Sequence, residues 1–366
     1  MEILLLLAVL FLAATNGAND NFKGVATLYG SRRAGYWTSL IWASTATLAG
    51  SLCSVFFAHA LMKAFTGAGL VPASVAAQVR FALAVAGGGA VTVALAAWRG
   101  LPISTTHALV GAMSGAGLIA VGSAVHFATL GSSFLLPLLA SPVIAIVPAF
   151  LLAPLLRRWV ARLAAAEPAC VCVAETAMAT PEGLVMRSAT FEPMVGTEAE
   201  CRTAGARPVA SWRSRRGVDG LLFLLGGAVS FSRGLNDTPK IAALLLPVAL
   251  LDGHGGLAVA LVGAAMLAGG LLGARRVART LSDRITDLDV GGALAAGLTT
   301  SLLVGTASFN GLPVSTTHVS VGALAGTGMS GGSRVDRRVM TSIILSWVVT
   351  LPFGALAGAI LYALLR

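Results

Sequence analysis

The chain has 366 residues, of which 56% are hydrophobic and only 11% are charged, whereas about 25% of the residues of a soluble domain carry a charge. This composition excludes a soluble globular fold. The net charge of +10 does not indicate nucleic-acid binding, because the Lys and Arg residues form short clusters between apolar runs, as in the cytoplasmic loops of membrane proteins.

The apolar runs are long enough to cross a bilayer, which takes about 20 helical residues. The first run begins at Ile3. No basic segment precedes it and more apolar sequence follows it, so it is predicted to be a membrane span and not a cleaved signal peptide. Later runs are predicted to span the membrane at 37–62, 130–156, 221–246, 257–272 and 339–365, and to form re-entrant hairpins at 81–122 and 291–328.

Two motifs occur twice, in the same order and at nearly the same offset. Gly-x-Asn-Asp-x-x-Lys begins at Gly17 and again at Gly234, and Gly-Leu-Pro-x-Ser-Thr-Thr-His begins at Gly100 and again at Gly311. Such a pattern indicates gene duplication. The predicted membrane repeats are residues 1–156 and 218–366.

The halves are joined by residues 157–217, which contain Pro, Glu, Arg, Ser and Thr without a sustained apolar period. This composition predicts a mobile cytoplasmic linker. Its three cysteines, Cys170, Cys172 and Cys201, match no standard zinc spacing. Because thiols stay reduced in the cytoplasm, we expect them to be free.

Basic residues gather in the loops and predict which loops face the cytoplasm. The first half then crosses the membrane three times, so the second half is inverted and both termini lie outside. The fold class is therefore an all-α, multi-pass protein of the cell (inner) membrane with two inverted repeats, an architecture typical of secondary transporters. The clusters are Arg32-Arg33, Arg157-Arg158-Arg162, Arg213-Arg215-Arg216, Arg275-Arg276-Arg279 and Arg334-Arg337-Arg338.

The tips of the two hairpins are expected to meet near the middle of the membrane, where broken helices are tolerated only beside protein or a water-filled cavity. The charges in and beside the motifs sum to +2 if all lie at depth, which suits a divalent oxyanion. They are Asp20, Asp237, Lys23, Lys240, Arg99 and Arg233.

Hydroxyl groups and helix N-terminal amides at the tips add further oxyanion ligands. Hydrogen phosphate keeps a hydroxyl that a buried carboxylate can accept, whereas sulfate has none, so the aspartates favour phosphate. The predicted substrate site comprises Asn19, Asp20, Lys23, Arg99, Ser104, Thr105, Thr106, His107, Arg233, Asn236, Asp237, Lys240, Ser315, Thr316, Thr317 and His318.

Some of these residues have simpler interpretations. Arg99 follows Trp98 and would be an interfacial anchor if the hairpin is wrongly placed, and its counterpart in the repeat is Asn310. Lys23 can extend to the membrane surface. Histidines such as His107 are often structural hydrogen-bond donors.

These motifs resemble those of the inorganic phosphate transporter (PiT) family of secondary carriers. Gly17-Ala18-Asn19-Asp20 matches the first family motif, the stretch beginning at Gly234 matches it except for Leu235, and both Pro-x-Ser-Thr-Thr-His segments match the second. The resemblance implies an inverted-repeat phosphate carrier coupled to sodium or protons. It places binding residues in the Asn-Asp pairs and Ser-Thr-Thr tips, and it is compatible with a homodimer.

One departure from the family pattern occurs in both halves. The family commonly has Asn three residues after the motif Asp, and here Lys23 and Lys240 stand at that place. We hypothesise that each ammonium takes the electrostatic role of a sodium ion. Alternating-access transport is then sodium-independent, with the proton favoured as coupling ion.

Other functions remain open from the sequence. A sulfate or other oxyanion permease differs only in substrate. A divalent-metal carrier would use Asp20, Asp237, His107 and His318, although the nearby cations would repel a metal ion. An intramembrane hydrolase would use Ser104 and His107, but the duplication fits a symmetric carrier better. We expect no enzymatic activity, no cofactor and no resident metal; the expected partners are phosphate or a related oxyanion and the lipid bilayer.

Overall fold

The structure is a computed structural model that describes residues 1–165, 169–179, 185–197, 200, 203, 207–212, 214–251, 253–283, 288–332 and 335–366. Cys201, Arg213 and Arg334 lie outside these ranges. The chain forms two compact units, one made of Met1–Leu156 with Leu222–Arg366 and the other of Arg157–Leu221.

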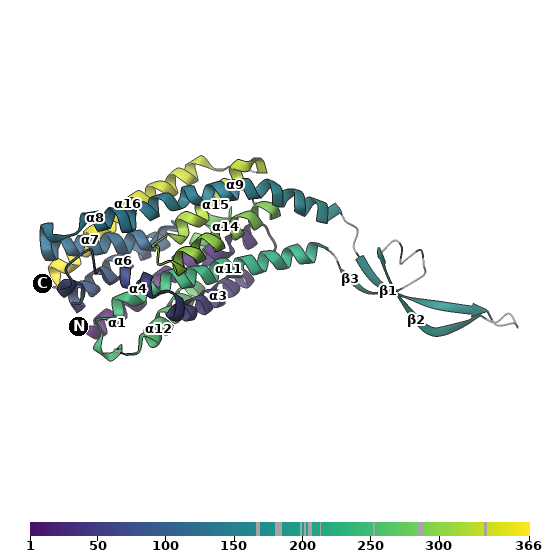
Figure 1. Ribbon diagram of the computed structural model, residues 1–366, viewed down its shortest axis with the longest axis horizontal. Coiled ribbons are helices and arrows are strands. Elements are labelled where there is room, and N and C mark those ends of the chain that lie inside the picture. The colour runs from purple at the N-terminus through teal and green to yellow at the C-terminus, as the bar shows by residue number, and fades with distance from the viewer. Residues whose placement is uncertain are drawn as a thin grey trace. The chain divides into compact units, whose positions relative to one another are not determined.

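The larger unit is a bundle of helices (Figure 1). Its first half contains α1 (Glu2–Asp20), η1 (Asn21–Val25), α2 (Ala26–Gly30), α3 (Tyr36–Phe57), α4 (His59–Ala64), α5 (Ala73–Ala76), α6 (Val79–Arg99), α7 (Thr105–Val121), η2 (Gly122–Ala124), α8 (Phe127–Thr129), η3 (Leu130–Leu135) and α9 (Leu136–Ala165). Its second half contains α11 (Ser214–Ala242), η4 (Ala243–Leu245), η5 (Ala249–Leu251), α12 (Gly255–Gly273), α13 (Arg275–Asp283), α14 (Val290–Phe309), α15 (Thr316–Thr327), η6 (Gly328–Gly332) and α16 (Arg337–Leu364). The end of α9, from Arg157, and the start of α11, up to Leu221, belong to the smaller unit.

Within the described residues, nine helical segments are long and apolar enough to cross a membrane. They correspond to the predicted spans and to three of the four predicted hairpin helices; the fourth, α15, has 12 residues. The mostly helical membrane fold is therefore confirmed. The inverted relation between the halves stays a prediction.

The two halves interlock through the first glycine of each Gly-x-Asn-Asp motif. A Cβ on Gly17 of α1 would lie 1.9 Å from the carbonyl oxygen of Met266 in α12, and a Cβ on Gly234 of α11 would lie 2.1 Å from that of Thr47 in α3. Only glycine permits such a close approach of two helices. Each motif helix thus packs against the second span of the opposite half, which holds both halves in one unit.

Both hairpins turn in the same way at their tips. Gly100 follows α6 with φ +73° and Gly311 follows α14 with φ +66°, a left-handed conformation that favours glycine. Ser104 and Ser315 then cap α7 and α15, each accepting a hydrogen bond from the backbone amide of the motif histidine at 3.2 Å. The repeated sequence therefore produces a repeated break, with the N-cap chemistry expected of serine.

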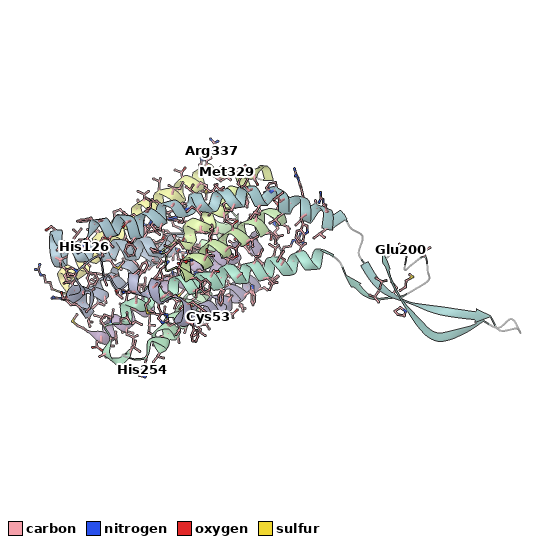
Figure 2. The ribbon with its side chains drawn as sticks, in the orientation of Figure 1. Cys53, His126, Glu200, His254, Met329 and Arg337 are labelled. Atoms are coloured by element: carbon pink, nitrogen blue, oxygen red, sulfur yellow. The ribbon has the colours of Figure 1, made fainter. Side chains whose placement is uncertain are left out.

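The hairpins enter the bundle from opposite ends. The base of α6 lies beside the chain's C-terminus, where the rings of Phe81 and Tyr362 are 6.4 Å apart. The base of α14 lies beside the end of α2, where a Cβ on Gly30 would contact Leu288. In Figure 1 both termini lie at one end of the bundle. In Figure 2 the labelled His126 and His254 lie toward that end and Arg337 lies away from it.

The smaller unit contains a three-stranded antiparallel sheet in the order β2-β1-β3. Its strands are β1 (Ala169–Ala179), β2 (Val185–Thr197) and β3 (Arg207–Trp212). The linker composition did not predict these strands. Cys172 is disulfide-bonded, so the expectation of free thiols is wrong for this residue, whereas Cys53 in α3 is free.

Candidate functional site

Lys23 lies in η1, where the first span is interrupted, and its ammonium group is enclosed by four oxygen atoms. It donates to Asn19 Oδ1 at 3.1 Å and to the Ile103 carbonyl at 2.9 Å, and also to Asp20 Oδ1 and Thr317 Oγ1. Two of these residues come from the same motif, one comes from the first hairpin tip and one from the second. The lysine therefore joins both halves of the protein.

Lys240 in α11 has the same surroundings. It donates to Thr106 Oγ1 and to the Val314 carbonyl at 2.9 Å each, and to Asp237 Oδ1 at 3.3 Å; Asn236 Oδ1 is its fourth acceptor. The oxygens again comprise a carboxylate, an amide, a backbone carbonyl and a threonine hydroxyl. The duplicated motifs thus build two equivalent lysine sites, and each takes its hydroxyl from the hairpin of the other half.

The two tips also contact each other directly. Thr317 Oγ1 donates to the Ile103 carbonyl at 2.7 Å, and Thr106 Oγ1 donates to the Val314 carbonyl at 3.4 Å. The meeting of the tips that the sequence predicts is therefore present in the structure.

Arg233 connects the lysine sites and breaks their symmetry. Its guanidinium donates to Asn16 Oδ1 at 2.7 Å, to Asn21 Oδ1 at 2.5 Å and to Thr47 Oγ1 at 3.2 Å. Its Nε lies 3.5 Å from Asp237 Oδ2 without a hydrogen bond. Asn16 also donates to Thr105 Oγ1 at 2.9 Å and to Asp20 Oδ2 at 3.2 Å. The arginine therefore couples the two Asn-Asp segments across the boundary between the halves.

The asparagine of each motif is held by a hairpin. Asn19 Nδ2 donates to the Leu101 carbonyl and Asn236 Nδ2 donates to Ser308 Oγ, both at 2.9 Å. Each amide group therefore presents its oxygen to the lysine with its nitrogen fixed. The side chains of Asn16, Asn21, Thr47 and Ser308 were not predicted site residues. For Asn16 the repeat gave a signal, because it is the counterpart of Arg233.

The cluster contains five charged residues, and they are enclosed on all sides, since none of them is more than 4% exposed. Their charges sum to +1 if all are ionised, instead of the predicted +2. In an interior of low dielectric constant a surplus cation favours an anionic ligand. The five residues are Asp20, Lys23, Arg233, Asp237 and Lys240.

Arg99 accounts for the difference in charge, because the structure does not bring it to the cluster. It ends α6, immediately before the left-handed turn at Gly100, and is exposed. It lines a separate cavity of about 130 Å³ together with Ser346 and Thr350. The structure therefore places Arg99 apart from the cluster, contrary to the arrangement that the sequence predicts.

The other predicted residues of the hairpin tips lie in three different surroundings. Ser104 and Ser315 use their hydroxyls as helix caps, and Thr316 is buried beside Ser315. The rings of His107 and His318 contact each other, with centroids 4.7 Å apart, and both line an apolar cavity. Among the described residues, no three His, Cys, Asp or Glu side chains form a group that could hold a metal ion.

A helical membrane bundle in which two broken hairpins meet over buried paired charges is typical of secondary carriers. A model of the Phosphate transporter family matches residues 16–358. The chain belongs to this family.

Individual relatives agree with the family. A putative phosphate permease of Haemophilus influenzae is 35% identical over 157 residues, which are 40% of this chain and 37% of that protein. The low-affinity inorganic phosphate transporter PitA of Escherichia coli is 39% identical over 96 residues, 26% of this chain and 19% of that protein. The chain thus spans well under half the length of these two relatives in the matched regions.

Two similarities extend over the whole chain. A probable low-affinity inorganic phosphate transporter of Mycobacterium bovis is 27% identical over 100% of this chain and 79% of that protein. A solved structure described as the sodium-dependent phosphate transporter has a TM-score of 0.75 at 21% identity and covers 100% of this chain and 98% of its own. This second similarity shows that the two proteins share a fold.

Proposed function

We propose that this protein carries inorganic phosphate across the membrane by alternating access, with the anion bound between the hairpin tips and the two Asn-Asp segments. The observation that carries the proposal is a donor and an acceptor left without hydrogen bonds inside the buried cluster. Arg233 Nε and Asp237 Oδ2 lack such partners among the described residues. They form an ion pair with each other, 3.5 Å apart, but make no hydrogen bond.

A protonated phosphate fits this pair better than sulfate does. Its negatively charged oxygen accepts from Arg233 Nε while its hydroxyl donates to Asp237 Oδ2. Sulfate at neutral pH offers acceptors only, so its oxygen would face the carboxylate without a proton between them. Sites that hydrogen-bond a substrate hydroxyl reject analogues that lack it, because the site's own polar group is then left unpaired.

The cluster charge of +1 favours the singly charged form, dihydrogen phosphate. Its entry brings the buried charge to zero, whereas the doubly charged form leaves −1. Carrying the singly charged form moves one more proton per phosphate than carrying the doubly charged form. This is the physical basis on which we favour the proton over sodium as the coupling ion.

The lysines support the sodium-independent part of the proposal. Hard cations bind carboxylate, amide and carbonyl oxygens, and the ammonium groups of Lys23 and Lys240 are enclosed by oxygens of these kinds together with a hydroxyl. A covalently attached cation in that position fills the place and repels a free one. We therefore propose that the two lysines act as permanent replacements for bound sodium.

Uptake of radiolabelled phosphate into proteoliposomes that contain the purified protein tests the proposal. Uptake is expected in sodium and in choline buffers alike, to rise when the outside pH falls from 8 to 6, and to resist excess sulfate. In Asp237→Asn the preference for phosphate over sulfate is expected to fall by about tenfold or more, which is the effect of one hydrogen bond to a charged group. Strict sodium dependence would contradict the role of the lysines. Equal inhibition by sulfate in the parent would indicate a broader oxyanion permease.

A further inference from the structure

A cavity of about 520 Å³ lies between α9 and α16, behind the hairpin tips. Its mouth is formed by apolar side chains that are exposed on two membrane-spanning helices: Leu139, Val143, Ile344 and Val348. Its inner wall includes His107, His318 and Trp347, which are buried. In a bilayer the mouth faces the acyl chains of lipids, because the exposed residues of α9 and α16 around it are apolar.

Two histidines of the inner wall, His107 and His318, carry polar atoms that make no hydrogen bond within the described part of the chain. His318 Nδ1 lies 2.9 Å from the Leu138 carbonyl, so this nitrogen carries the proton and Nε2 carries a lone pair. His318 Nε2 and His107 Nδ1 have no hydrogen-bond partner among the described residues, and the two side chains are 2% and 5% exposed. Buried polar atoms are normally hydrogen-bonded, so a partner from outside the chain is expected.

The lining specifies the chemistry of that partner. The walls accept an apolar chain, and His318 Nε2 accepts a hydrogen bond. A phospholipid acyl chain fills the walls but brings no donor to the imidazole. An apolar helix of a second protein copy has the same deficiency. A carboxylic acid head group supplies both an O–H donor for His318 and a carbonyl acceptor for an N–H of His107.

We propose that this cavity binds a long-chain fatty acid, or another single-chain amphiphile with a carboxyl group, which enters from the bilayer between α9 and α16. The cavity volume lies within the range of about 300–1,000 Å³ that is typical of small-molecule sites.

The position of the cavity gives such a ligand a regulatory role. Hairpin helix α15 packs tightly on α9, since a Cβ on Gly322 would lie 2.5 Å from the Pro142 carbonyl oxygen. Hairpin helix α7 packs as tightly on α16, where a Cβ on Gly115 would lie 1.8 Å from the Ala355 carbonyl oxygen. The cavity is lined by all four helices, so a bound fatty acid connects one hairpin–helix pair to the other. If transport requires the hairpins to separate, as the proposed function implies, the ligand slows transport.

Photo-crosslinking tests the site independently of transport. The purified full-length protein is placed in phosphatidylcholine liposomes with a diazirine derivative of palmitic acid, irradiated and digested, and the labelled peptides are identified by mass spectrometry. Saturable labelling of α9 and α16 is expected. Oleic acid should compete at about tenfold lower concentration than methyl oleate, because the ester lacks the donor for His318.

Matched variants separate the cavity from the rest of the lipid-facing surface. Val143→Trp fills the mouth and is expected to abolish the labelling. Val147→Trp changes an equally apolar residue of α9 that is 54% exposed and lies outside the cavity lining, and it should leave labelling unchanged. His318→Phe should make oleic acid and methyl oleate equal competitors. Gel filtration and thermal unfolding establish that each variant is folded.

Three results would overturn the proposal. They are labelling that does not saturate, equal competition by acid and ester in the parent, and protein-to-protein crosslinks through α9 or α16 in place of lipid adducts. The last result would identify the cavity as part of a contact between two copies of the chain. Because photo-labelling needs no phosphate, a failure of labelling is distinct from a failure of phosphate uptake. Inhibition of phosphate uptake by oleic acid in the parent but not in Val143→Trp would connect the cavity to transport.

Discussion

Replacing both buried lysines with asparagine is expected to make the protein respond to sodium. Each substitution removes a cation that four oxygens surround, and removing one partner of a buried ion pair costs about 3–5 kcal/mol. A sodium ion that enters the vacated oxygens replaces the lost charge. At 100 times its dissociation constant, a bound ligand returns about 2.7 kcal/mol per site, which corresponds to a rise of the melting temperature of about 3–4 °C per site for a chain of 366 residues.

The measurement is the melting temperature of Lys23→Asn and Lys240→Asn, separately and together, in detergent with sodium chloride or with choline chloride at equal ionic strength. The parent should melt at the same temperature in both salts. Lys63→Asn is the control, because Lys63 in α4 is an exposed lysine outside the cluster. The reasoning is refuted if folded lysine variants melt identically in both salts, or if sodium stabilises the parent as much as the variants.

Three further predictions concern single side chains. Arg99→Gln should leave phosphate uptake within about twofold of the parent, because Arg99 is exposed and outside the cluster. Arg233→Gln should reduce uptake by more than tenfold, because it removes a buried charge and its hydrogen bonds. The initial rates of uptake into liposomes, measured in parallel, compare the two variants. Ser104→Ala and Ser315→Ala should each cost about 1 kcal/mol of stability through loss of an N-cap, which the shift of the melting temperature measures, with the exposed Ser132→Ala as control. A membrane-impermeant thiol reagent applied to intact cells tests on which side of the membrane the segment around Cys172 lies. The basic clusters place it inside, so Cys172 should stay unlabelled after mild reduction. Labelling would place the segment outside, in an oxidising compartment where a disulfide is typical.

The sequence was sufficient for the features that depend on local patterns. Apolar length located the spans, the left-handed positions at Gly100 and Gly311 coincide with the predicted breaks, and the serines cap the following helices as their chemistry requires. The repeat also predicted that the two tips meet, and they contact each other and the motif lysines. These predictions succeeded because each is determined by residues close together in the chain or by the membrane itself.

Contacts between distant segments could not be predicted in the same way. The pairing of Lys23 with Thr317, a residue of the opposite half, depends on how the hairpins cross, and no local pattern specifies that crossing. Arg99 was assigned to the site because charge near a membrane motif usually marks function, but the turn at Gly100 leaves it exposed. The strands of the smaller unit lacked a clear alternation of apolar and polar residues, so composition alone predicted a linker.

The two lysine sites are equivalent, but the arginine between them is not duplicated. Arg233 occupies the position of Asn16 in the repeat, and it donates to Asn16 itself at 2.7 Å. If the halves exchange conformations when the carrier turns from one side of the membrane to the other, this single arginine makes the two orientations unequal in their affinity for phosphate. Asn16→Arg combined with Arg233→Asn keeps the net charge and moves the guanidinium to the other half.

The exchanged variant should therefore reverse the inequality between the two sides. The KM for phosphate uptake and the KM for phosphate efflux are measured in liposomes in which external protease has established the orientation of the protein. The parent should show two different values, and the exchange should invert their order while Arg233→Asn alone raises both. Equal values on the two sides of the parent membrane would show that the arginine does not distinguish the orientations, and the asymmetry would then have no role in the transport cycle.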